Sequence, residues 1–64
     1  MADYGMKIKS KRLELKLTQQ ELALIIGCSR KTIIDYEKGK VKSPSKLMTT
    51  AFAKAFSVSE DELF

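Results

Sequence analysis

The apolar and polar positions along the chain follow the pattern of short amphipathic helices separated by breaks. Gly27 and Gly39 each end a run of good helix formers, and Pro44 marks a third boundary. No segment shows the strict apolar–polar alternation of a half-buried strand bounded by hairpin turns. The pattern therefore predicts an all-α fold, a compact bundle of five short helices. The expected helices cover approximately residues 6–15, 19–26, 30–38, 46–56 and 60–64.

Two of these helices indicate which side should face the core. In the first, Ile8, Arg12 and Leu15 recur at intervals of four and three residues, so two aliphatic side chains flank an arginine on one face. The Lys-rich remainder of that helix, with Lys7, Lys9 and Lys11, should face solvent or a ligand. In the fourth helix, the expected buried stripe consists of Leu47, Ala51, Phe52 and Ala55.

The start of the second expected helix has the sequence of a capping box. The Thr18 hydroxyl can accept from the amide three residues on, and Glu21 can reach back to the Thr18 amide. Leu17 and Leu22 flank this box and are placed to form a hydrophobic staple. The helix should end at Gly27, which adopts the left-handed conformation without strain.

Serines are expected to cap the three later helices. Ser29 and Ser45 precede the third and fourth helices, where their hydroxyls can accept from backbone amides. Ser59 precedes the last helix, and Glu62 three residues later predicts a second capping box there. Three acidic residues at positions 60–62 would then lie at a helix N-terminus, where the macrodipole favours negative charge.

The charge of the chain is strongly biased toward its middle. Residues 7–54 contain all 12 Lys and Arg and four of the 8 acidic residues, so they carry +8, whereas the net charge of the whole chain is +4. Such a basic body suits a polyanion, either nucleic acid or an anionic membrane surface. A membrane-surface helix needs bulky aromatics that the first helix lacks, and the longest apolar run, Leu22 to Ile26, is far shorter than the ~20 residues of a membrane span.

Composition also limits the chemistry available. The 64 residues include one Cys and no His, which excludes an internal disulfide, most metal sites and imidazole-based catalysis. There is no Gly-rich phosphate loop, and no pair of acids expected to be buried together. We therefore expect no enzyme activity, no cofactor, no metal and no small-molecule ligand.

The second and third helices, joined by a tight turn at Gly27, have the arrangement of a helix-turn-helix. In that motif the second helix enters the major groove of DNA. Arg30 and Lys31 can donate to guanine O6 and N7, Asp35 can accept from cytosine N4, and Ile34 can contact a thymine methyl. The expected partner is therefore double-stranded DNA.

From Ile8 to Phe64 the sequence resembles the Cro/CI-type (xenobiotic-response-element-type) helix-turn-helix family of phage-repressor-like regulators. The matching motifs are Ile8-x-x-x-Arg12, Leu17-Thr18-Gln19-x-Glu21-Leu22-Ala23, Gly27-x-Ser29, Thr32-Ile33, Tyr36-Glu37-x-Gly39-Lys40, Pro44 and Ala53-x-Ala55-x-x-Val58-Ser59-x-x-Glu62-Leu63. The resemblance implies a single lambda repressor-like domain over residues 1–64. It implies a sequence-specific regulator, expected to be a repressor that binds a pseudo-palindromic operator as a homodimer, located in the cytoplasm at the nucleoid.

The resemblance also assigns roles to individual residues. Arg12 and Glu37 match a pair that forms an interior salt bridge between the first and third helices. Leu63 and Phe64 are candidates for a dimer interface, although a core-capping role is favoured for both. The base-reading positions are Arg30, Lys31, Ile34 and Asp35, and the DNA-backbone positions are Gln19, Ser29, Thr32, Lys40, Lys42 and Ser45.

Three features depart from the family pattern. Ser57 replaces the usual glycine after the fourth helix, and Leu24 and Ile25 stand at commonly polar positions. Cys28 replaces a small aliphatic residue, and we expect it to be a small buried hydrophobe. Exposed together, Leu24 and Ile25 would form an apolar patch suited to a partner. They support an alternative function, a protein-interaction module (antitoxin-like or anti-repressor) that binds through Leu24, Ile25 and Phe64.

Overall fold

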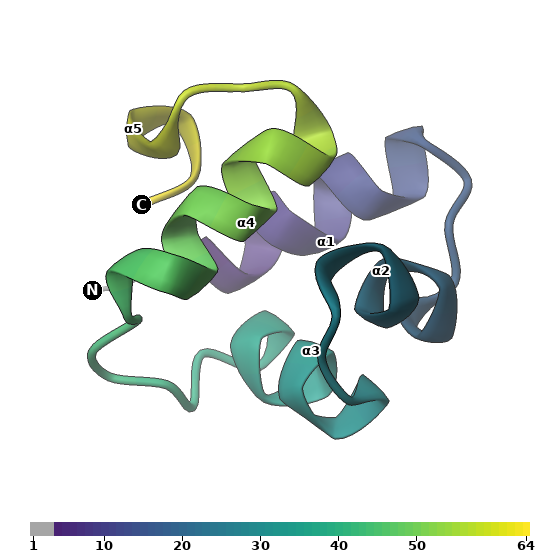
Figure 1. The fold of residues 1–64 in the computed structure, drawn as a ribbon, viewed down its shortest axis with the longest axis horizontal. Helices are drawn as coiled ribbons and strands as arrows, with labels where there is room; N and C mark the ends of the chain where they lie inside the picture. Colours follow the sequence, from purple (N-terminus) through teal and green to yellow (C-terminus); the bar gives the residue numbers. More distant parts are fainter. Residues whose placement is uncertain (1–3) are drawn as a thin grey trace.

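Five helices account for most of residues 4–64, the part of the chain that the computed structural model describes (Figure 1). Those residues contain no strand, and the predicted all-α fold of five short helices is confirmed. None of the helices is long and apolar enough to cross a membrane, as far as residues 4–64 show. The helices are α1 (Tyr4–Glu14), α2 (Gln19–Ile26), α3 (Arg30–Glu37), α4 (Lys46–Phe56) and α5 (Glu60–Leu63).

Helix ends that depend on neighbouring residues lie where the sequence predicts them. Thr18 Oγ1 accepts from the Glu21 amide at 3.0 Å, and Glu21 Oε1 accepts from the Thr18 amide at 2.8 Å, which completes the capping box. Ser29 and Ser45 cap α3 and α4 through their hydroxyl oxygens. Gly27 ends α2 with a φ of 91°, a left-handed conformation that glycine adopts at little cost.

The second predicted capping box is wrong. The Ser59 side chain makes no capping hydrogen bond, and the Glu62 amide donates instead to the Ser59 carbonyl oxygen at 3.1 Å. The helix that follows has only four residues and is held by its neighbour rather than by its cap. Glu60 accepts from Lys46 Nζ at 3.0 Å and from the hydroxyls of Thr49 and Thr50 at 2.9 and 3.2 Å, so α5 is fastened to α4.

Two leucines expected in the core are exposed. Leu15 lies beyond the end of α1, which begins at Tyr4 and stops at Glu14, so it no longer follows the Ile8–Arg12 face. Leu47 is 79% exposed. The core side of α4 is formed by Phe52, Ala53 and Phe56, and the helical repeat of 3.6 residues places Leu47 on roughly the opposite side.

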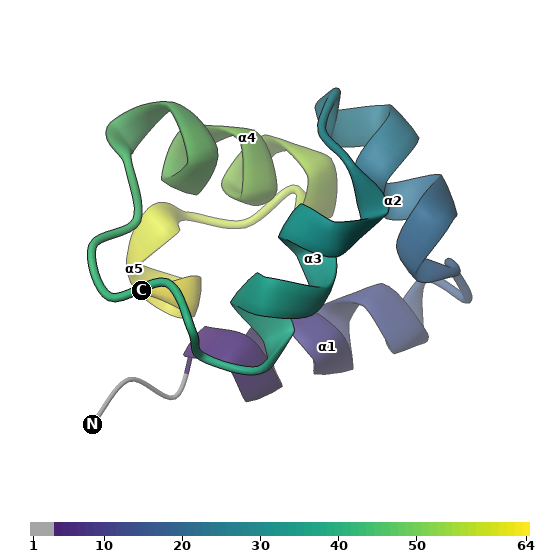
Figure 2. The ribbon, with the colours of Figure 1, turned by 90° about the horizontal axis from the view of Figure 1, so that it is seen from below.

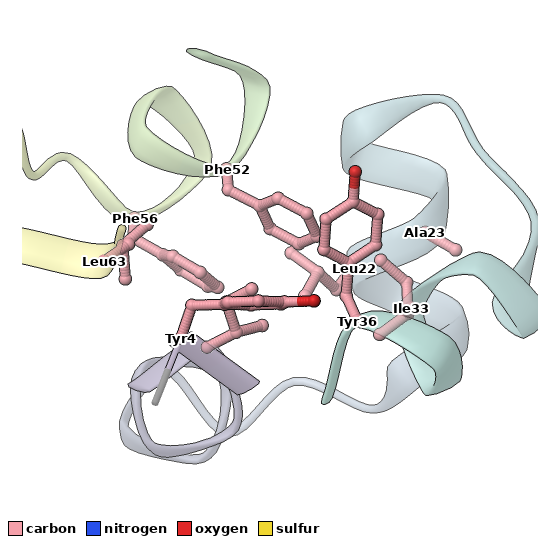
Figure 3. Packing of buried hydrophobic residues seen from close by; sticks show 9 residues of the cluster. Tyr4, Leu22, Ala23, Ile33, Tyr36, Phe52, Phe56 and Leu63 are labelled. Carbon is pink, nitrogen blue, oxygen red and sulfur yellow. The ribbon is translucent and has the colours of Figure 1, made fainter. Parts of the chain in front are cut away.

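The core is an aromatic and aliphatic cluster to which all five helices contribute (Figure 3). The Tyr36 ring lies 5.0 Å from Phe52 and 6.0 Å from Tyr4, centroid to centroid. The Tyr4 hydroxyl donates to the Val41 carbonyl oxygen, which ties the start of α1 to the segment between α3 and α4. The buried hydrophobic residues of this cluster are Tyr4, Ile8, Leu22, Ala23, Ile33, Tyr36, Phe52, Phe56 and Leu63.

The backbone at Gly5 and at Ser57 carries strict conformational demands. A Cβ at Gly5 would lie 2.5 Å from the Glu37 carbonyl oxygen, so glycine is what allows α1 to approach α3 this closely. Ser57 adopts φ 57° and ψ 42°, the left-handed conformation for which the family usually has glycine. That conformation costs a residue with a Cβ about 1 kcal/mol.

Candidate nucleic-acid interface

The α3 helix has one buried and one exposed side. Ile33 and Tyr36 lie in the core, so the turn containing Arg30 and Lys31 points outward and both side chains are exposed. Figure 2 shows α3 running beside α1, with α2 next to its N-terminal end. This arrangement leaves the first turn of α3 accessible to a large ligand, which is what a recognition helix requires.

A buried ion pair fixes α3 to α1. Arg12 Nε lies 2.6 Å from Glu37 Oε2, and both side chains are almost fully buried. Arg12 Nη1 also donates to the Leu17 carbonyl oxygen at 2.8 Å, so the segment before α2 is held as well. The salt bridge that the family resemblance implies between Arg12 and Glu37 is therefore present.

Glu37 also orients a residue at the start of α2. Gln19 Nε2 donates to Glu37 Oε1 at 3.2 Å, the same oxygen that accepts from Arg12 Nη2 at 3.3 Å. One carboxylate therefore joins the first turn of α2 to the last turn of α3. The spacing of Gln19 and Glu37 in the sequence gives no sign of this contact, and sequence reasoning missed it.

Two of the expected base-reading residues bind each other. Lys31 Nζ lies 2.9 Å from Asp35 Oδ2, one helical turn away on α3. This hydrogen bond, together with the positive charges of Lys31, Lys40 and Lys38, lowers the pKa of Asp35 below its ordinary value. Asp35 is therefore ionised at neutral pH and can only accept hydrogen bonds. Ile34 lies beside the pair and is half-buried.

Ser29 and Ser45, two of the positions expected to contact the DNA backbone, use their hydroxyls to cap helices. Ser29 Oγ accepts from the Thr32 amide at 3.2 Å and lies 3.0 Å from Thr32 Oγ1. Ser45 Oγ accepts from the Met48 amide at 3.2 Å. These serines therefore order the first turns of α3 and α4, and each hydroxyl already accepts a hydrogen bond from a backbone amide of the chain.

Lysines surround the C-terminal end of α3. Lys40 and Lys42 are exposed in the connection to α4, and the Lys40 amide donates to the Asp35 carbonyl oxygen at 2.9 Å. Lys38, which the sequence analysis did not single out, is exposed one turn after Asp35 and contributes to lowering its pKa. The spacing of Lys31, Asp35 and Lys38, four and three residues apart, could have indicated that they share a face.

The two candidates for a dimer interface lie in different environments. Leu63 is 1% exposed and belongs to the core, so the protein surface does not present it. Its burial agrees with the favoured core role, and a dimer contact at this end of the chain stays a prediction. Phe64 is 40% exposed and stacks on Tyr4 at 5.4 Å.

The three departures from the family pattern also have defined places. Ser57 takes the strained left-handed conformation described above. Leu24 and Ile25 are exposed, as an apolar patch requires. Cys28 is partly buried against the core, and burial raises the pKa of its thiol above the ordinary value.

Sequence comparison identifies relatives along almost the whole chain. A sequence model described as helix-turn-helix matches residues 8–63. An uncharacterized HTH-type transcriptional regulator of Methanocaldococcus jannaschii is 43% identical over 91% of this chain and 86% of its own length. Another, from Methanothermobacter thermautotrophicus, is 48% identical over 75% of this chain and 68% of its own length.

Solved structures share the fold. The P22 c2 repressor, crystallised with a synthetic operator, superposes with a TM-score of 0.91 at 28% identity, over all of this chain and 96% of that one. The restriction-modification controller protein C.AhdI of Aeromonas hydrophila gives a TM-score of 0.87 at 25% identity, over 98% of this chain and 94% of that one. This chain belongs to the Cro/CI-type helix-turn-helix family of transcriptional regulators.

Proposed function

We propose that this regulator binds double-stranded DNA sequence-specifically and represses transcription by occupying a pseudo-palindromic operator as a homodimer. The observation that carries the proposal is the exposed first turn of α3, with Arg30 and Lys31, on a helix anchored by the buried Arg12–Glu37 pair. Binding of an operator by the structurally similar P22 c2 repressor supports it. Two-fold symmetry would place the half-sites about one helical turn of DNA apart.

Four residues of α3 are proposed to read bases. Arg30 and Lys31 donate to guanine, and the ionised Asp35 accepts from the amino group of cytosine. Ile34 contacts a thymine methyl. Because Lys31 and Asp35 are already paired, the two residues are expected to act on adjacent bases as a unit.

A second group is proposed to contact the DNA backbone and to set the register of α3. Lys40 and Lys42 supply charge at the end of α3, where they neutralise phosphates. The remaining backbone contacts are proposed for Gln19, Ser29, Thr32 and Ser45, which lie at the first turns of α2, α3 and α4.

Residues 1–64 are proposed to act as one DNA-binding domain, and the DNA partner implies a location at the nucleoid. We also infer that the chain is not an enzyme, since its relatives are named as transcriptional regulators. Phe64 is the residue that we retain as a candidate for the dimer contact, because part of its ring is exposed.

Selection of bound duplexes from a random DNA pool at about 150 mM salt tests the proposal. A specific regulator should enrich one sequence that it binds at least ~10³-fold more tightly than random DNA. Enrichment of a two-fold symmetric site supports a homodimer. A single asymmetric site argues against the dimer, and an unenriched pool with weak, salt-sensitive binding refutes sequence-specific recognition.

A further inference from the structure

An apolar groove runs between α2 and α4, outside the residues proposed to bind DNA. It has a volume of about 290 Å³ and is lined by Ile25, Ile26, Ala51, Lys54 and Ala55. Ile25 is 57% exposed, whereas its neighbour Ile26 is partly buried and packs against the core. We call this feature the α2–α4 groove.

The apolar surface continues along α4 beyond the groove. Leu47, Ala51 and Lys54 are spaced four and three residues apart, so they share one face of α4. Leu47 is the most exposed large apolar residue of those that the structure describes, at 79%. Helix α4 therefore presents Ala51 and Lys54 at the groove and Leu47 about one turn before it, on one face of the helix.

The charge of this face indicates what kind of partner fits it. Helix α4 contains Lys46 and Lys54 and no acidic residue. Lys46 is neutralised by Glu60 at 3.0 Å, whereas no carboxylate within residues 4–64 forms an ion pair with Lys54. In a two-fold symmetric contact across this face, a second copy would place its own Lys54 against the groove, and each copy carries a net charge of +4. Charge complementarity therefore favours an acidic partner over self-association.

We propose that the α2–α4 groove binds an amphipathic α-helix of a different protein. The apolar residues of that helix recur three and four positions apart and fill the groove beside Ile25 and Ala51, and a carboxylate on its flank pairs with Lys54. Ala51 and Ala55 lie 6 and 10 residues after Ser45, about 9–15 Å along α4 at 1.5 Å per residue. The groove residues are thus different from those proposed to contact DNA, and this inference does not depend on DNA binding.

A displayed library of helical peptides tests the proposal with the full chain as the target. The library carries leucine at positions i, i+3, i+4 and i+7 and a random choice of Glu, Gln or Lys on both flanks. We expect the enriched peptides to carry Glu on one flank and to bind the Lys54→Glu variant at least tenfold more weakly. Replacing that Glu by Lys in the peptide should restore binding to Lys54→Glu.

Two further variants locate the site. Lys9→Glu makes the same charge change on an exposed residue of α1 and should leave peptide affinity unchanged. Ala51→Arg should block the groove while circular dichroism shows the helices intact. Enriched peptides without acidic preference, or peptides that bind Lys54→Glu and Ala51→Arg as tightly as the wild type, would overturn the proposal. So would a wild-type dimer in sedimentation that Lys54→Glu dissociates, because the occupant would then be a second copy.

Discussion

The buried Arg12–Glu37 pair offers the sharpest test of how the fold supports the candidate interface. Glu37→Gln keeps the size of the side chain but removes its charge, so the Arg12 charge is left uncompensated in a nearly fully buried position. Breaking a buried pair from one side costs about 3–5 kcal/mol. We expect a loss near the lower end, about 3 kcal/mol, because the amide oxygen of the introduced glutamine can still accept from Arg12.

That loss is large for a chain of 64 residues. At ~0.05–0.15 kcal/mol per residue, the whole free energy of unfolding is about 3–10 kcal/mol. A loss of about 3 kcal/mol should lower the melting temperature by about 12 °C or more. Urea unfolding followed by circular dichroism measures the free energy directly, and an unchanged m-value would show that the folded state keeps its compactness.

A double-mutant cycle separates the charge effect from packing. The cycle compares Arg12→Met and Glu37→Met singly with the double variant that carries both. Replacing both partners removes the buried charges together and should recover at least half of the loss that either of these single replacements causes. The reasoning would be refuted by a Glu37→Gln variant that loses less than about 1 kcal/mol. It would also be refuted by a double variant whose loss equals the sum of the two single losses, because the pair would then contribute no coupling.

Four other outcomes are expected. Arg30→Ala should weaken operator binding by about 1–3 kcal/mol and relax preference at one base pair, and an equal loss on all sequences would make Arg30 a phosphate contact. Lys40→Ala should weaken binding to all sequences alike and lower the salt slope by about one unit, and titration at several salt concentrations detects an unchanged slope. Ser57→Gly should raise the free energy of unfolding by up to about 1 kcal/mol, since Ser57 is left-handed, and a destabilised variant would contradict this. The depressed pKa of Glu60, caused by its bonds with Lys46 and Thr49, stabilises the fold above its unfolded value of about 4.5, and this stabilisation is lost as the pH falls through the lower folded value. Thermal melts of Glu60→Gln should therefore show a weaker dependence on acid pH than wild type.

The helix ends were predictable from sequence wherever one or two neighbouring residues decide them. The capping box at Thr18 and the left-handed turn at Gly27 depend on local hydrogen bonds and on the absence of a Cβ. The predicted box at Ser59 did not form: its side chain makes no capping hydrogen bond. The four-residue α5 is instead fastened to α4 through Glu60, a contact between residues far apart in sequence that local helix signals do not indicate.

Which side of a helix is buried proved harder to predict. Leu47 belongs to an apolar pattern on α4, but two overlapping patterns exist, and Phe52 with Phe56 determines the one that faces the core. Large aromatic rings bury more surface than Leu47 or Ala51 can, so they decide the rotation of the helix. The pattern alone does not show which of the two sets of residues faces the core. The exposure of Leu47 in the structure is what identifies the second apolar surface of α4.

In the candidate site, too, features set within one helix were predictable from sequence, whereas contacts between helices were not. Exposure of Arg30 and Lys31 follows from the burial of Ile33 and Tyr36 on the same short helix, and sequence periodicity contains that information. The contact between Gln19 and Glu37 joins residues 18 positions apart and exists only once α2 and α3 are packed. The roles of these residues toward DNA stay predictions that the selection experiment addresses.

Asp35 on α3 is expected to give the proposed interface its selectivity. A carboxylate near DNA is repelled by phosphates. Lys31 Nζ, 2.9 Å from Asp35 Oδ2, neutralises the charge of that carboxylate and so offsets the repulsion. Opposite a cytosine amino group, Asp35 gains a hydrogen bond, whereas opposite an acceptor it is desolvated without one. We therefore expect Asp35 to act mainly by rejecting wrong bases, a form of specificity that an all-basic helix, however tightly it binds, cannot supply.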